Sequence, residues 1–187
     1  NRAEVRALLD LFAERIHDVV EGVLALGGGP LFRIIGPEAC TPPMTPPEMF
    51  AEFVALYDRP IIDRLHRAGC FARIHCHGRI GEAADHILAM APDALDPVEE
   101  PPGGDISLVE AVERFGGSLS LMGNVQEALF EKGTPDDVRR EVARVKEAAR
   151  ASGRFVLMPT ATPITVPLPP RVEENLFAFI EAGLSDE

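Results

Sequence analysis

Apolar side chains along the chain follow two alternating patterns, one typical of helices and one typical of short strands. From residue 8 to residue 24 they recur at steps of three and four, the spacing that puts side chains on one face of an α-helix. The run Gly27-Gly28-Gly29-Pro30 should end that helix. Residues 31–35 then form a short apolar run that stops at Gly36-Pro37, which predicts a β-strand.

The same cycle recurs along the rest of the sequence. Further strands are expected at residues 71–76, 94–98, 118–122 and 155–158. Helices are expected at residues 45–65, 80–90, 107–115, 134–151 and 170–182. Thr45 should cap the first of these helices, because Pro46 follows in the first helical position and Glu48 stands three residues after the cap.

Alternating strands and helices predict an α/β fold with a parallel sheet covered by helices. A doubly wound sheet and part of a (β/α)8 barrel are both compatible with this pattern. Five units are too few to close an eight-stranded barrel, which takes about 250 residues. Right-handed crossovers should place the five strands in sequential order. No Gly-x-Gly-x-x-Gly turn follows any strand, so the nucleotide-binding fingerprint is absent.

Composition narrows the class of protein. The 187 residues suit a single domain over residues 1–187, and the 46% of apolar residues exclude a disordered chain. A formal net charge of −12 argues against nucleic acid and anionic membranes as partners. Without a long apolar run or a signal peptide, a cytoplasmic location is expected. Three well-spaced cysteines, Cys40, Cys70 and Cys76, should then stay reduced.

The densest group of chemically able side chains is His75-Cys76-His77, at the end of a predicted strand. Because side chains alternate along a strand, the two histidines should share one face and Cys76 should point to the other. The carboxyl ends of parallel strands are where active sites of such folds form. The two imidazoles can bind a metal, transfer protons or hold a carboxylate. The alternative is a structural pair that hydrogen-bonds loop carbonyls.

Other strand ends carry polar groups that should gather at the same rim. These are Glu38 after the first strand, Asp96, Glu99 and Glu100 at the third, Asn124 and Gln126 at the fourth, and Thr160 at the fifth. Each of them alone is more often a loop or capping residue. Their expected convergence at one rim is the reason to treat them as candidates.

Several segments together resemble one family. Residues 73–78 resemble the His-x-Cys-Gly strand end of uroporphyrinogen-decarboxylase-like proteins. The remaining similar segments are residues 45–50 (a "SPEMF" helix entry), 121–125 (a Gly-Asn segment), 129–138 (a "GTPEEV" helix start), 155–159 (the final strand) and 169–176 (a "P-x-E-N" helix). They occur in the family's order and cover nearly the whole chain.

This resemblance implies a (β/α)8 barrel, of which the chain would be the C-terminal five units. The family includes decarboxylases of uroporphyrinogen, which use no cofactor, and methyltransferases that act between corrinoid proteins and thiols. The methyltransferases hold zinc with a His-x-Cys pair and a late Cys. Here His75 matches the histidine, His77 stands in place of the first cysteine, and Ala161 stands near the late one. A zinc site would therefore need His75, His77 and a carboxylate from Glu38, Glu99 or Glu100.

The chain is therefore expected to act closer to the methyltransferase branch, because the decarboxylase's late "GHG" segment is absent. The resemblance implies methyl transfer between a corrinoid carrier and a thiol acceptor, with a corrinoid protein as a possible partner. Expected roles are catalysis for His75, His77 and Asn124, and binding of the small-molecule substrate for Glu38, Gln126 and Thr160. Uroporphyrinogen decarboxylation and a non-catalytic binding domain are the alternatives. The open sheet edges should be covered by missing barrel units or by a homo-oligomer.

Overall fold

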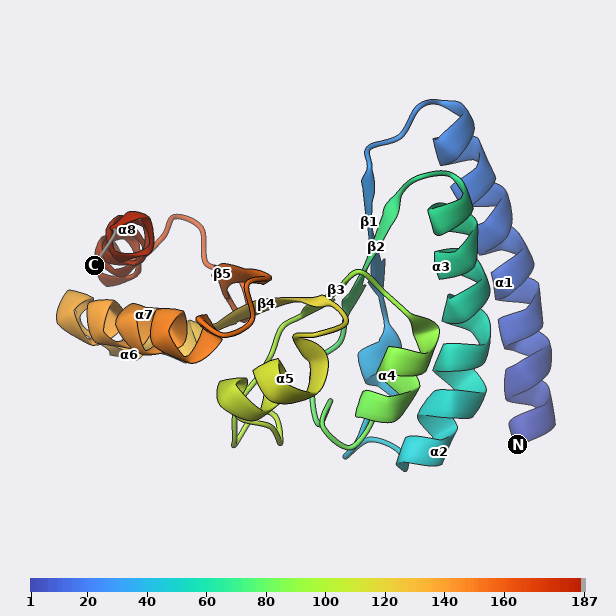
Figure 1. The fold of residues 1–187 in the computed structure, drawn as a ribbon, viewed down its shortest axis with the longest axis horizontal. Coiled ribbons are helices and arrows are strands. Elements are labelled where there is room, and N and C mark those ends of the chain that lie inside the picture. The colour runs from blue at the N-terminus through green and yellow to red at the C-terminus, as the bar shows by residue number, and fades with distance from the viewer. Residues whose placement is uncertain (186–187) are drawn as a thin grey trace. The chain divides into compact units, whose positions relative to one another are not determined.

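The computed structural model describes residues 1–185 and shows alternating strands and helices (Figure 1). Its strands are β1 Leu31–Ile35, β2 Phe71–His75, β3 Ala94–Asp96, β4 Ser120–Val125 and β5 Phe155–Pro159. They follow one another in the order β1-β2-β3-β4-β5, and the pairs β1·β2 and β4·β5 are parallel. The predicted α/β fold and the sequential strand order are confirmed. The chain divides into two compact units, Asn1–Leu95 and Asp96–Glu187.

The first unit contains β1, β2 and the helices around them. The helical elements are α1 Arg2–Ala25, a 3-10 turn at Pro37–Cys40, α2 Pro47–Phe50, a π-helical segment at Ala51–Ala55, α3 Leu56–Arg67 and α4 Ala84–Met90. The core side chains Phe50, Ile62, Leu65, Ile74 and Ile87 are fully buried. Residues Leu31 and Ile35 of β1 pair with Phe71 and His75 of β2, so both strands end together.

Helix α1 lies beside α3 and is joined to the α2–α3 segment by polar contacts (Figure 1). Arg6 Nε donates to Glu52 at 2.9 Å, Tyr57 donates to Asp10 at 2.8 Å, and Arg64 Nη2 donates to Glu21 at 2.7 Å. The apolar stripe of α1 stays exposed along its length; it comprises Leu8, Phe12, Ile16, Val19 and Val23. Its periodicity therefore predicted the helix, but most of the stripe remains exposed in the described chain.

The expected cap at Thr45 is wrong. The helix begins at Pro47, with the extended residue Pro46 as its N-cap. A residue that precedes proline is pushed out of the helical region by the ring that follows it, so Pro46 is not helical before Pro47. Thr45 instead donates its hydroxyl to the sulfur of Cys40 at 3.5 Å.

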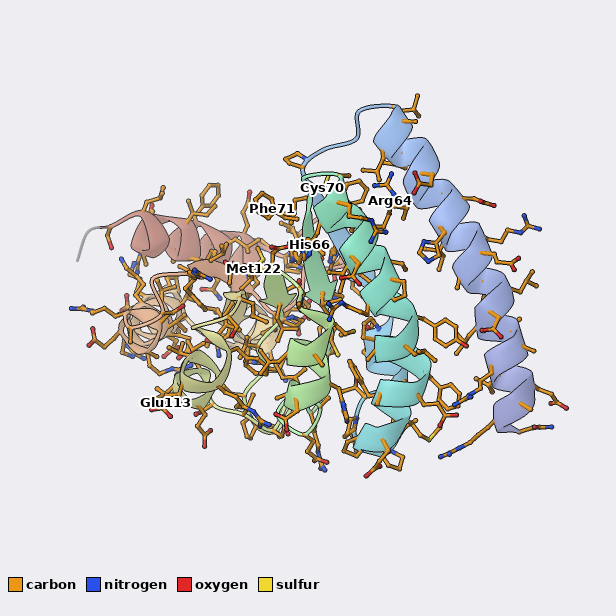
Figure 2. The ribbon with its side chains drawn as sticks, turned by 45° about the vertical axis from the view of Figure 1, so that its right-hand side comes forward. Arg64, His66, Cys70, Phe71, Glu113 and Met122 are labelled. Atoms are coloured by element: carbon orange, nitrogen blue, oxygen red, sulfur yellow. The ribbon has the colours of Figure 1, made fainter. Side chains whose placement is uncertain are left out.

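Asp93, just before β3, accepts hydrogen bonds from the end of α3 and from β2. His66 Nε2 lies 2.8 Å from an Asp93 carboxylate oxygen that also accepts the Ala72 N–H at 2.7 Å. Figure 2 shows His66 and Cys70 where α3 leads into β2 at Phe71. The structure joins none of the three cysteines in a disulfide, as expected for unpaired thiols.

The second unit packs helices against β4 and β5. Its helices are α5 Leu108–Phe115, α6 Glu127–Lys132, α7 Pro135–Ala149 and α8 Pro170–Leu184, with α7 and α8 side by side (Figure 1). Capping boxes start α5 at Ser107 and α7 at Thr134, where each cap side chain and its partner three residues later satisfy each other's backbone N–H.

The predicted end of the fourth strand is wrong. The sequence places it at residue 122, before Gly123-Asn124, whereas β4 continues to Val125. Val125 pairs with Pro159 of β5, and its carbonyl accepts the Thr160 N–H at 2.9 Å. Pairing with β5 therefore extends the strand, and Asn124 lies within it. Among residues 1–185, no helix has both the length and the apolar character needed to cross a bilayer.

Candidate functional site

Two imidazoles meet where β2 ends. His75 is the last residue of β2 and is 9% exposed, and His77 follows two residues later. Their ring centroids lie 4.7 Å apart, with the planes at 86°. The i, i+2 spacing puts both rings on one side of the extended backbone, and their edge-to-face contact is a favourable aromatic geometry. The first unit thus presents two imidazoles in contact, side chains of a kind that can exchange protons or ligate metals.

The thiol between them is part of the scaffold. Cys76 is fully buried, and its sulfur lies 3.2 Å from the Thr41 hydroxyl oxygen. That hydroxyl donates its single hydrogen to the Pro37 carbonyl at 2.8 Å, and the Cys76 S–H has two acceptors within reach, the Thr41 hydroxyl oxygen and, at 3.6 Å, the His77 carbonyl oxygen. Cys76 therefore fastens the end of β2 to the loop after β1.

Gly78 shapes the turn by which the chain leaves β2 after His77. Gly78 has φ +94°, and a Cβ there would lie 3.0 Å from the Pro42 carbonyl oxygen. The next residue, Arg79, donates its N–H to that carbonyl at 2.9 Å. The chain leaving His77 can therefore follow this path only because residue 78 has no side chain.

The donor set around the histidines does not suit zinc. A catalytic zinc site takes three protein ligands. Within residues 1–185 no group of three or more His, Cys, Asp or Glu side chains is placed to hold a metal ion. Glu38, in the 3-10 turn after β1, accepts the N–H of Gly36 at 3.1 Å. The pair supplies two imidazoles without the third ligand.

Of the three carboxylate candidates in the second unit, Asp96 is the buried last residue of β3, and Glu99 and Glu100 follow it. Glu100 accepts the Leu108 N–H at 2.9 Å, at the start of α5, and binds Arg144 of α7 at 2.6 Å. The hydrogen bonds that Arg144 donates to Glu141, and then those to Glu100, raise the pKa of its guanidinium. Glu99 lies in a tight loop, since a Cβ on Gly104 would overlap the Glu99 carbonyl. Glu100 therefore links α5 to α7.

The other candidates of the second unit lie at the carboxyl ends of β4 and β5. Asn124 is completely buried, and neither its Oδ1 nor its Nδ2 has a hydrogen-bond partner among the described residues. The buried Nε2 of Gln126 also lacks a partner there. Thr160 accepts the Glu127 N–H at 3.2 Å and so helps to start α6. Asn124 and Gln126 thus carry unused hydrogen-bonding capacity.

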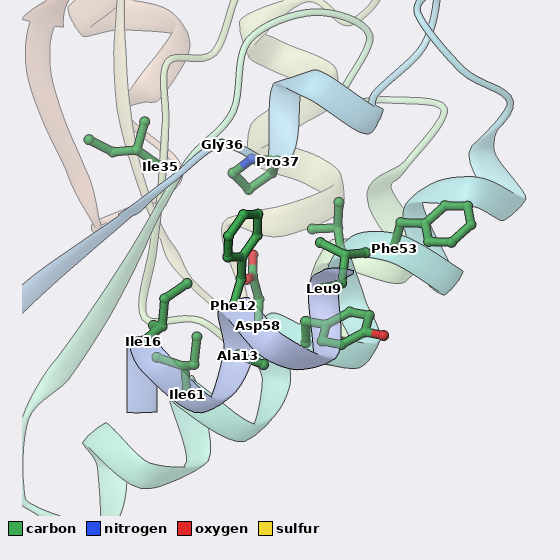
Figure 3. A pocket seen from close by; sticks show the side chains of 12 residues that line it. Leu9, Phe12, Ala13, Ile16, Ile35, Gly36, Pro37, Phe53, Asp58 and Ile61 are labelled. Carbon is green, nitrogen blue, oxygen red and sulfur yellow. The ribbon is translucent and has the colours of Figure 1, made fainter. Parts of the chain in front are cut away.

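Sequence reasoning missed one feature of the first unit. A cavity of about 160 Å³ lies between α1, α3 and the end of β1, and Asp58 belongs to its mostly apolar lining (Figure 3). No described residue gives Asp58 a hydrogen bond or an ion pair, and burial raises the pKa of its carboxyl to about 7. The signal was available, because Asp58 falls on the apolar helical spacing between Val54 and Ile61.

Comparisons with known proteins agree with this architecture. The family model described as uroporphyrinogen decarboxylase (URO-D) matches residues 1–183. A comparison with curated protein sequences gave no match. A solved methyltransferase from Methanosarcina mazei is similar in structure, with a TM-score of 0.66 and 22% sequence identity. The match covers 85% of this chain and 43% of the methyltransferase, so this chain spans less than half the length of that protein.

Proposed function

Because the chain belongs to the uroporphyrinogen decarboxylase family, we propose that it carries part of the site of a methyltransferase that moves a methyl group from a corrinoid carrier to a small-molecule thiol. The observation that carries this proposal is the His75–His77 pair at the end of β2. The fold shared with the M. mazei methyltransferase supports the choice of branch.

The histidine pair would prepare the nucleophile. Thiolates, and not thiols, attack carbon, and imidazole is the side chain best suited to exchange a proton near neutral pH. In the proposed step an imidazole takes the thiol proton, and the thiolate sulfur forms a bond to the methyl carbon. The cobalt–carbon bond breaks with both electrons left on cobalt, so Co(III) becomes Co(I), and the proton passes to solvent.

Zinc remains a prediction of the resemblance alone. Zinc would lower the pKa of a bound thiol and hold it as thiolate. The described residues supply two of the three ligands that such a site needs, so we derive no step through a metal.

The proposal also covers the cellular location of the protein and the exposed apolar surfaces of the first unit. Reduced cysteines suit the cytoplasm, which we propose as the location. The exposed stripe on α1 and the exposed side chains Leu31 and Ile35 of β1 would be covered in the working protein. Further βα units or a second copy of the chain would serve as the cover, and a corrinoid protein would deliver the methyl group.

The test is methyl transfer from methylcobalamin to a small thiol, followed by the absorbance change of the corrinoid. His75→Ala and His77→Ala should each lower the rate by about 100-fold or more, the usual contribution of a general base. His86→Ala, on α4, is the matched control and should keep the wild-type rate. Equal rates for all variants would make the pair structural. Decarboxylation of uroporphyrinogen in place of methyl transfer would support the other branch, and neither activity would favour a binding domain.

A further inference from the structure

Asn124 is a buried amide whose polar atoms are both unused. It is completely buried, and the described residues offer no donor to its Oδ1 and no acceptor to its Nδ2. Asn175 in α8 is a useful contrast, because its Nδ2 donates to the carbonyls of Phe130 and Gly133 at 2.9 and 3.0 Å. Leaving a buried amide without partners is costly. Asn175 still has one orphaned atom, its Oδ1, whereas Asn124 has two, and the full loss of partners at Asn124 is what points to a ligand.

The strand register places Asn124 on a face with other candidate groups. Side chains alternate along strands, and Asn124 pairs with Met158. One face of β4 and β5 therefore carries Met122 (labelled in Figure 2), Asn124, Gln126, Val156, Met158 and Thr160. The opposite face is turned to the helices, since Leu157 lies 3.1 Å from the position of a Cβ on Gly183 in α8. Val156 is 45% exposed, so the Asn124 face is partly open.

The two segments that carry this face supply no positive charge for an anionic ligand group. Residues 121–131 and 155–169, which include the carboxyl ends of β4 and β5, contain no Lys or Arg. The only ionisable side chains there are Glu127 and Glu131. A carboxylate buried beside Asn124 would have no cation from these segments, and burying an unpaired charge is strongly unfavourable. It would also leave Oδ1 of Asn124 without a donor, because a carboxylate only accepts.

We propose that Asn124 and Gln126 bind a neutral carboxamide group of the substrate. The ligand N–H would donate to Asn124 Oδ1, and Asn124 Nδ2 and Gln126 Nε2 would donate to the ligand carbonyl oxygen, which has two lone pairs. These three bonds use the three orphaned atoms of Asn124 and Gln126. The inference rests on the proposed function, since a corrinoid ring carries carboxamide side chains whereas uroporphyrinogen carries carboxylates. The carboxamide is then the chemical group by which this end of the sheet would select a corrinoid over uroporphyrinogen.

The small number of side-chain amides makes an NMR test of this proposal easy to interpret. The chain contains only four side-chain amides, those of Asn1, Asn124, Gln126 and Asn175. The experiment is a titration of the 15N-labelled full chain with propionamide and, separately, with propionate, observing the four side-chain NH2 signals. Propionamide should shift the Asn124 and Gln126 signals and leave Asn175, which is already bonded, in place. Propionate should bind at least about tenfold more weakly, because it leaves Asn124 Oδ1 unpaired.

Two variants complete the design. Asn124→Asp and Gln126→Glu each replace an amide donor by a carboxylate oxygen, and each should abolish the propionamide shifts of the remaining amide. Gln126 is partly exposed, so Gln126→Glu keeps the test valid if Asn124→Asp does not fold. Equal response to propionate, or no propionamide shift at Asn124 and Gln126, would overturn the inference. Propionamide binding in a chain without methyl transfer would overturn the proposed function alone, because the NMR signals do not depend on turnover.

Discussion

Replacing Asp58 by asparagine should stabilise the chain by an amount that grows with pH. The Asp58 carboxyl borders the apolar cavity between α1 and α3, among Leu9, Phe12 and Ile61 (Figure 3). Burial raises its pKa from 3.8 to about 7, and no neighbouring charge contributes to the shift. The folded chain therefore holds a proton on Asp58 over a pH range in which the unfolded chain has lost it.

The sign and size follow from linkage. A raised pKa in the folded state means that stability is fully present below pH 3.8 and is lost as the pH rises to about 7. Each pKa unit corresponds to about 1.4 kcal/mol, so the loss reaches at most about 4 kcal/mol above pH 7. Tyr57, which lines the same cavity, stays neutral in this range, because its hydrogen bond to Asp10 raises its pKa above 10. Among the residues that line this cavity, Asp58 is thus the one that titrates between pH 3.8 and about pH 7.

The assay is urea unfolding followed by circular dichroism at a series of pH values. Asp58→Asn and wild type should have similar unfolding free energies at about pH 4, and the variant should be more stable by up to about 4 kcal/mol at about pH 8. Asp63→Asn is the control on the same helix, where the carboxylate is exposed and paired with Arg59 at 2.7 Å. Its effect should stay below about 1 kcal/mol at every pH. A stability difference for Asp58→Asn that does not change with pH would refute the reasoning.

Three further perturbations test the scaffold of the site. Asn175→Ala should lower the unfolding free energy by about 2–3 kcal/mol, because it leaves two buried carbonyls without donors; an unchanged urea midpoint would contradict the bridge from α8 to the end of α6. Gly78→Ala should cost about 1–3 kcal/mol through strain at φ +94°, whereas Gly22→Ala, in open space on α1, should stabilise that helix slightly in the same melt. Sedimentation equilibrium should show self-association that Val19→Lys, on the exposed stripe, weakens; a monomer at all concentrations would exclude a second copy as the cover.

The sequence alone determined features that depend on neighbours a few residues away. The strand at residues 31–35 was predicted with its observed bounds, because an apolar run between glycines and prolines has few other conformations. The start of α7 was predicted at residue 134, and the capping box found there needs only residues up to Asp137. The order of the strands followed from the length and handedness of the crossovers. Even the meeting of His75 and His77 follows from the two-residue period of an extended chain.

The tertiary structure decided whatever depends on a distant partner. Residue 122 looked like the end of a strand, but pairing with β5 carries β4 through Asn124 to Val125. Helix α6 was missed, since its start uses the hydroxyl of Thr160, 33 residues further along the chain. The sequence pattern also could not separate Asn124 from Asn175, because both are buried asparagines. Whether a buried amide is bonded or unused depends on which carbonyls the folded chain brings to it, and only packing determines that.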